Sequence, residues 1–113
     1  MEISIRNKKL RKSIEDSKKL VKEYGAKMAN IIQRRLDDLY NADTLEDTRN
    51  IPGHYHELRE DKKGYWACDL EQPYRLIFTP KQRPIPQNEH GQYIWAEIVS
   101  IEITEINNYH KEK

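Results

Sequence analysis

The spacing of the hydrophobic residues changes near residue 53 of this 113-residue sequence, and this change constrains the fold more than any other feature. Between residues 7 and 40 apolar residues recur every three or four positions, which is typical of the buried stripe of an α-helix. From residue 54 onward apolar and polar residues alternate, which is typical of strands with one buried face. The sequence therefore predicts an α+β domain.

The helical segment divides at Gly25, because glycine tolerates the left-handed backbone that ends many helices. Asn7 stands where a helix N-cap belongs. We therefore predict one helix from Asn7 to Tyr24 and a second from about Ala26 to Tyr40, joined as an antiparallel hairpin. Their apolar stripes are Leu10, Ile14, Leu20, Val21 and Tyr24 in the first helix and Met28, Ala29, Ile32, Leu36 and Leu39 in the second.

Short alternating runs between turn residues predict the strands. Thr44 and Asp47 are spaced to cap one short turn before the strands of the second half begin. Residues 80–92 contain three prolines and a glycine, which predicts a loop, and the alternation after this loop slips near Ser100, which suggests a bulge or two shorter pieces. The predicted strands are residues 2–6, 54–59, 65–70, 74–79 and 93–106.

These elements predict a single domain over residues 1–113, with an N-terminal helical hairpin packed on one face of a mainly antiparallel, twisted sheet. The other face of the sheet is then open to a ligand. Cys68 is the single cysteine, so the reducing cytoplasm fits best. No apolar stretch approaches the roughly 18 residues that span a bilayer, and no signal peptide is visible, so we expect no membrane partner.

Charge is unevenly distributed along the chain. Residues 1–40 hold 11 Lys or Arg against 6 Asp or Glu, whereas residues 41–113 hold 9 against 13. A basic half of this kind can meet phosphates or an acidic protein surface. The alternative is an ordinary solvated helical face, and charge alone does not decide between the two.

Three segments carry a family resemblance: YGAKMANIIQRRLDDL, TLEDTRNIPGHYHELREDKKGYWACDLEQPYRLIFTP and the closing INNYH. The most specific pieces are H-x-L-R at His56 to Arg59, the Tyr74-Arg75 pair and the terminal Tyr109-His110. In this order the chain resembles, over nearly its whole length, the RelE/ParE superfamily of toxins and within it the HigB branch of plasmid-maintenance killer proteins. The resemblance implies a RelE-like fold.

The resemblance also implies a function, that of the toxin in a type II toxin–antitoxin system. Such a toxin is an endoribonuclease that enters the ribosomal A site and cuts messenger RNA there, with no metal or other cofactor. The partner implied is a helix-turn-helix, HigA-like antitoxin, with which the toxin would form a hetero-oligomer.

RNA can be cut without a metal because its own 2′-OH is the nucleophile. A base must accept the 2′ proton, an acid must protonate the leaving 5′ oxygen, and cations must stabilise the charged phosphorane. Histidine suits the proton transfers and arginine suits the phosphate. The catalytic residues expected are His56, Arg59, Arg75, Tyr109 and His110, and the substrate-binding residues are Lys62, Lys63 and Asn108.

The resemblance assigns individual roles to four of these residues. Arg59 and Arg75 would contact the scissile phosphate, and His110 would act as general acid or base. Tyr109 would stack on a base or orient the 2′-OH. The family commonly ends in Asp-Tyr-His, whereas this chain has Asn108 in place of the aspartate. If the aspartate of the family contributes directly to catalysis, this chain has weak or no ribonuclease activity. If the aspartate only orients its neighbour, Asn108 can take that role.

Alternative interpretations exist for several of these residues. His54 and His56 form a His-x-His pair that could hold zinc with His90, His110 or Cys68, but no second close pair exists and we expect no metal. Cys68 itself is expected to be inert. The simpler interpretations of the remaining residues are that Arg75 pairs with Asp69 or Glu71, and that Trp66 and Phe78 belong to the core.

Two other functions share the predicted fold. ParE-like relatives inhibit DNA gyrase and need no catalytic histidine. A catalytically inactive, toxin-like module that binds an antitoxin is the third candidate, and Asn108 together with the net charge of +1 motivates it. Proteins that dock on ribosomes gain affinity by neutralising phosphates, and a chain of low net charge gains less.

Overall fold

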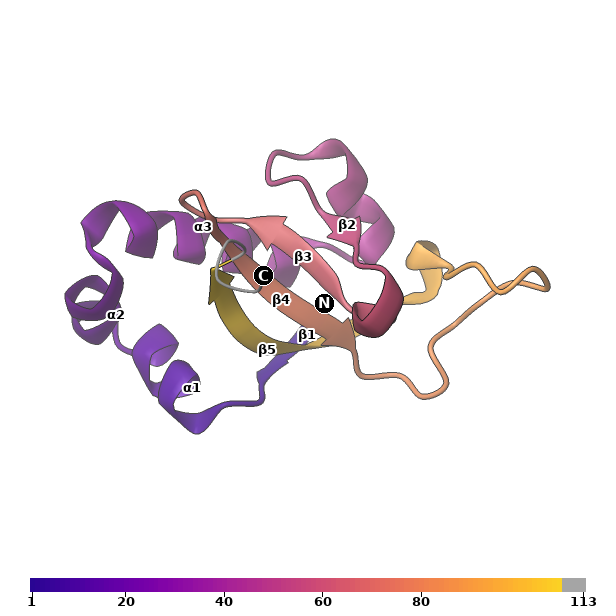
Figure 1. Cartoon of the computed structure of the whole chain (residues 1–113), viewed down its shortest axis with the longest axis horizontal. Helices are drawn as coiled ribbons and strands as arrows, with labels where there is room; N and C mark the ends of the chain where they lie inside the picture. The colour runs from indigo at the N-terminus through magenta and orange to yellow at the C-terminus, as the bar shows by residue number, and fades with distance from the viewer. Residues whose placement is uncertain (109–113) are drawn as a thin grey trace.

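Residues 1–108 are described by the computed structural model of the chain (Figure 1). Within them, one sheet is accompanied by α-helices and by short 3-10 helices, labelled η. In chain order the elements are β1 (Glu2–Ile5), α1 (Lys8–Glu15), α2 (Ser17–Tyr24), α3 (Ala26–Asn41), η1 (Leu45–Asn50), β2 (His56–Glu57), η2 (Glu60–Lys62), β3 (Trp66–Asp69), β4 (Tyr74–Pro80), η3 (Trp95–Glu97) and β5 (Ser100–Asn108).

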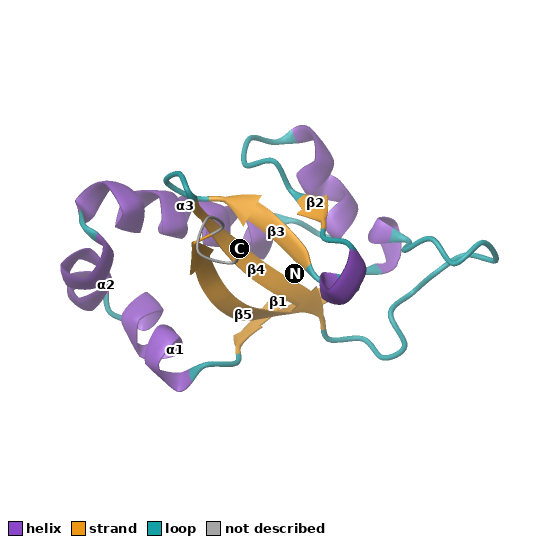
Figure 2. Ribbon diagram, in the orientation of Figure 1, coloured by secondary structure: helices purple, strands orange, loops and turns teal. Residues whose placement is uncertain are grey.

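The strands lie in the order β1-β5-β4-β3-β2, so the first and last strands of the chain are neighbours (Figure 2). β1 pairs with β5 in parallel, and the other three neighbouring pairs are antiparallel. The prediction of an α+β fold with a mainly antiparallel sheet is therefore confirmed.

The core lies between α3 and one face of the sheet. Trp66 of β3 and Phe78 of β4 are partners in the register, and both side chains are completely buried, which confirms that they belong to the core. Burying side chains of this size contributes roughly 2–3 kcal/mol each. The other principal core residues are Met28, Ala29, Ile32 and Leu39 of α3 and Leu76, Ile101 and Ile103 of the sheet.

The prediction of one helix from Asn7 to Tyr24 was wrong, because the chain breaks at Asp16. The backbone N–H of Asp16 closes α1 on the carbonyl of Ser13, and its carboxylate accepts from the backbone N–H groups of Lys18 and Lys19 at the start of α2. Aspartate competes for backbone donors in this way and favours caps over helix interiors. In Figure 1, α1 and α2 lie beyond one end of the sheet, and α3 lies behind it.

The capped turn predicted before the strands is confirmed. The Thr44 side chain and the Asp47 side chain form a reciprocal capping box at the start of η1. Asp47 Oδ2 accepts from the backbone N–H groups of Asp43 (2.8 Å) and Thr44 (3.2 Å). This box fixes the direction in which η1 presents Glu46 and Arg49.

The strand predicted over residues 54–59 shrinks to His56–Glu57 in the structure. His54 has a φ of 52° and follows Gly53, whose φ is 126°. Such a backbone is incompatible with extended pairing, so β2 cannot begin before His56. Alternation of residue types alone did not reveal this turn.

The strand predicted over residues 93–106 was also wrong in its bounds. Residues 95–97 form η3, and β5 begins at Ser100 and runs two residues further than predicted. The break expected near Ser100 is where β5 begins after η3. A separate register shift lies between Ile77 and Phe78 of β4, which pair with Glu105 and Ile103. The extra residue, Thr104, makes a β-bulge that places Thr104 and Glu105 on the same side of the sheet.

Asp16→Ala tests the cap that separates α1 from α2. Alanine removes the acceptor for two backbone donors, so we expect a loss of about 1 kcal/mol in the free energy of unfolding, measured by urea denaturation. Asp16→Asn keeps an acceptor oxygen, so its free energy of unfolding should fall by only a small part of this amount. Equal losses in the two variants would contradict the capping role.

Burial of Cys68 generates a prediction about pH. Burial raises the pKa of this thiol to about 12, whereas an exposed thiol titrates near ~8.5. The folded state therefore keeps a proton that the unfolded state has lost, so stability is complete below the unfolded pKa and falls as pH rises toward 12.

Between pH 9 and 11, Cys68→Ala should consequently lose less stability than the natural chain. The slope of the free energy of unfolding against pH should differ between the two proteins by a value that approaches about 1.4 kcal/mol per pH unit. Burial also raises the pKa of Tyr55, and this part of its shift is present in both proteins. Urea midpoints at pH 7, 9 and 10.5 measure the effect, and parallel curves for the two proteins would refute it.

Candidate functional site

The face of the sheet that points away from α3 carries most of the polar strand residues, and we call it the polar face. Residues opposite one another on neighbouring strands point to the same side. The register therefore places two rows across this face: His56, Ala67, Ile77 and Glu105 form one, and Asp69, Arg75 and Asn107 form the next.

Two histidines and an aspartate form a cluster at one end of these rows. The rings of His54 and His56 stack, with centroids 4.2 Å apart and an interplanar angle of 18°. Nδ1 of His54 lies 3.5 Å from Oδ2 of Asp69. The tight turn at His54 allows its ring to stack on the ring of His56. The carboxylate beside His54 is that of Asp69, which belongs to β3.

The hydrogen bonding of His56 determines which of its nitrogens can accept a proton. Nδ1 of His56 lies 2.7 Å from the backbone carbonyl oxygen of His54. A carbonyl oxygen only accepts, so Nδ1 carries the hydrogen, and in the neutral ring Nε2 then holds the lone pair. His56 is therefore preorganised as a proton acceptor through Nε2.

Arg75 lies on β4 on the same face as His56. It is half-buried and stands between Asp69 and Asn107 in the register. Strand spacing and rise place its Cα roughly 12 Å from that of His56, two strands over and two residues along. Two long side chains at this separation can approach one phosphodiester from opposite sides.

Of the two carboxylates considered as partners of Arg75, Asp69 faces it across β3 and β4. The other, Glu71, has its carboxylate 3.6 Å from Nζ of Lys27.

The remaining predicted residues within residues 1–108 lie in three places. Arg59 and Lys63 line a groove at the β2 edge of the sheet together with His56. Lys62 lines a hollow of about 300 Å³ beside the polar face. Asn108 pairs with Tyr74 and so belongs to the side of the sheet that faces the helices. Tyr109 and His110 lie outside the described residues, so their predicted roles remain predictions.

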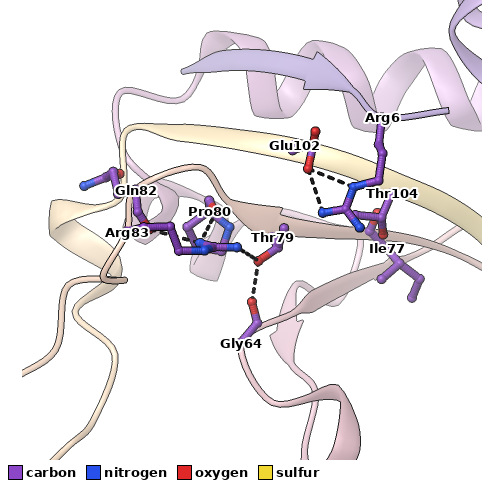
Figure 3. A network of polar contacts seen from close by, with 9 residues as sticks. All are labelled: Arg6, Gly64, Ile77, Thr79, Pro80, Gln82, Arg83, Glu102 and Thr104. Atoms are coloured by element: carbon purple, nitrogen blue, oxygen red, sulfur yellow. Dashed lines mark hydrogen bonds and ion pairs between the residues drawn. The ribbon is translucent and has the colours of Figure 1, made fainter. Parts of the chain in front are cut away.

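The sequence interpretation missed Arg6, which lines the same hollow as Lys62. Its guanidinium donates to Oε1 of Glu102 from Nε (3.0 Å) and from a terminal nitrogen (2.8 Å), as Figure 3 shows. This hydrogen bonding raises the pKa of Arg6. Arg6 reaches the polar face because β1 pairs with β5 at the far end of the chain, and no local pattern reveals such a pairing.

His54 and Asp69 were also undervalued as members of a site. His54 entered the sequence analysis as half of a possible zinc pair, and its side chain is exposed in the structure. Asp69 was considered only as a partner for Arg75. The His-x-His spacing followed by an aspartate on the next predicted strand was the available signal, since neighbouring strands bring such residues together.

Among residues 1–108, no group of three His, Cys, Asp or Glu side chains is arranged to hold a metal ion. No helix in this part of the chain has the length and hydropathy needed to cross a membrane. Comparisons of the sequence with family models and with curated proteins gave no match.

The protonation pattern of His56 is directly measurable. We expect the neutral ring to be the tautomer with hydrogen on Nδ1, because the carbonyl of His54 holds that hydrogen. Two-bond ¹H–¹⁵N correlation spectra at pH 8.5 distinguish the two tautomers. His90, whose side chain is exposed, serves as the internal control. A His56 ring with hydrogen on Nε2 would contradict the proposed preorganisation.

Proposed function

We propose that this protein is the toxin of a toxin–antitoxin pair and acts as a metal-free endoribonuclease on messenger RNA at the ribosome. One observation carries the proposal: His56, with Nε2 prepared to accept a proton, shares the polar face with Arg75. The proposal places the protein in the cytoplasm, with a helix-turn-helix antitoxin as partner, in keeping with the family resemblance of the sequence.

The proposed reaction follows from these two side chains. Nε2 of His56 accepts the 2′-OH proton, the 2′ oxygen attacks phosphorus, and Arg75 stabilises the negative charge of the phosphorane. The bond between phosphorus and the 5′ oxygen then breaks, and an acid protonates that oxygen. The resemblance assigns this role to His110. The products are a 2′,3′-cyclic phosphate and a 5′-hydroxyl.

Electrostatics of the polar face favour one competing function. Asp69, Glu102 and Glu105 place carboxylates on this face beside Arg75 and Arg6. Carboxylates repel phosphate, so the face attracts RNA less strongly than a purely basic surface would. This observation, together with Asn108, supports the alternative of an inactive module that binds an antitoxin.

Arg75→Ala should abolish the growth arrest caused by inducible expression of the chain in a bacterial host. Removal of one phosphorane-stabilising group typically costs about 100- to 1000-fold in rate. Arg75→Lys keeps the charge without the planar fork and should retain partial activity. Arg34→Ala is the matched control, because Arg34 is exposed on α3, on the other side of the sheet.

Growth and mapping of messenger RNA 5′ ends measure the outcome, and thermal melting shows whether each variant is folded. Full toxicity in a folded Arg75→Ala variant would refute the proposal. Growth arrest with supercoiling defects and no cuts would favour the gyrase function. No arrest from the natural chain, combined with tight antitoxin binding, would favour the inactive module.

A further inference from the structure

Two hollows meet at the β2 edge of the sheet, with volumes of about 580 and 610 Å³. They share four lining residues, Arg49, Glu57, Lys63 and Trp95, and together we call them the edge groove. The groove adjoins the polar face at His56, which also lines it. A ligand strand on the polar face could therefore continue into this groove.

Arg49 forms a flat, positively charged wall of the edge groove. Its guanidinium carbon lies 3.7 Å from the ring centroid of Trp95, and its Nε lies 2.8 Å from a carboxylate oxygen of Glu46. Trp95 is only 5% exposed, whereas the Arg49 side chain is 45% exposed. The second face of the guanidinium is thus available to the groove, and such planes stack on nucleic-acid bases.

Glu57 holds a carboxylate beside this flat surface. Nε1 of Trp95 donates to Oε2 of Glu57 at 2.7 Å, which fixes the orientation of the carboxylate. The same residue lines both hollows, so Glu57 lies where the two meet. A carboxylate accepts two parallel hydrogen bonds, and among the four RNA bases guanine offers two adjacent N–H donors, N1–H and the exocyclic amine.

Two exposed cations, Arg59 and Lys63, border the groove on the side of η2. Their charges suit the phosphates that flank a bound base. An acidic peptide could also approach these cations, but its carboxylates offer no hydrogen-bond donor to Glu57 and it has no base to stack on Arg49. The groove chemistry therefore favours a nucleotide over an acidic protein segment.

The far wall of the groove comes from the loop between β4 and η3, which is anchored at its base. Thr79 donates to the carbonyl of Gly64 at 2.7 Å, and Arg83 donates to the Thr79 hydroxyl at 3.4 Å (Figure 3). Gln82 donates to the carbonyl of Glu97 and accepts from the backbone N–H of Val99, both at 2.9 Å. These bonds preorganise the groove and lower the entropy lost on binding.

We propose that the edge groove binds one nucleotide of single-stranded RNA, with the base stacked on Arg49, guanine selected by Glu57 and the phosphates contacted by Arg59 and Lys63. The identification of the ligand as a substrate strand rests on the proposed ribonuclease function. Binding in the groove would then set a preference for guanine at a position beside the scissile bond.

Titration with 5′-GMP and with 5′-UMP tests the proposal. Binding is detected as a change in the NMR signal of the Trp95 indole N–H. We expect GMP to bind at least about tenfold more tightly than UMP, which is the discrimination that a paired hydrogen bond typically gives. Glu57→Gln should abolish this preference, and Lys63→Ala should weaken both nucleotides alike. Lys19→Ala, an exposed lysine on α2, is the control and should change neither affinity.

Equal affinity for GMP, UMP and inorganic phosphate would overturn base recognition. A shift caused by polyglutamate and not by GMP would show a protein-binding groove and would also overturn the proposal. Mononucleotide binding needs no cleavage, so the two proposals fail separately. GMP binding without growth arrest would refute the ribonuclease proposal. Growth arrest without GMP binding would refute the proposed guanine site.

Discussion

The packing of α3 against one face of the sheet is the constraint on which the rest of the structure depends. Because Trp66 and Phe78 must face α3, the residues next to them along β3 and β4 must face the opposite way. The register thus brings His56 and Arg75 to one surface through the burial of their neighbours. A slip of one residue would turn Arg75 toward α3 and Phe78 toward the polar face, so the core and the candidate site are specified together.

Periodicity predicted which segments are helices and which are strands, because burial of one side of an element makes apolar residues recur at a regular spacing. It failed where one residue redirects the backbone through local bonding or strain. Asp16 divides a helix whose apolar stripe continues across the break, and the positive φ at His54 shortens β2. The slip near Ser100 marked the start of β5 after η3, but the bulge at Thr104 was missed, because a pattern shows that phase is lost and not how many times the backbone departs from it.

The candidate site could be predicted in part for the same reason. His56 and Arg75 belong to locally recognisable strands, and antiparallel pairing brings them to one face. Arg6 could not be found in this way, since it depends on the pairing of β1 with β5, almost the whole chain apart. Arg59 was expected to contact the same phosphate as Arg75, but the turn after β2 directs Arg59 and the predicted substrate-binding residue Lys63 to the edge groove. The polar face therefore holds the proposed chemistry, and the groove holds the additional cations.

The chemical ends of cleaved RNA test the central claim most directly. Attack by the 2′-OH through His56 and Arg75 predicts fragments with a 5′-hydroxyl and a 2′,3′-cyclic phosphate, recovered from translated messages after induction. Enzymatic labelling that distinguishes 5′-hydroxyl from 5′-phosphate ends measures this in a single experiment. Fragments that carry 5′-phosphates would show that water is the nucleophile and would contradict the proposed mechanism.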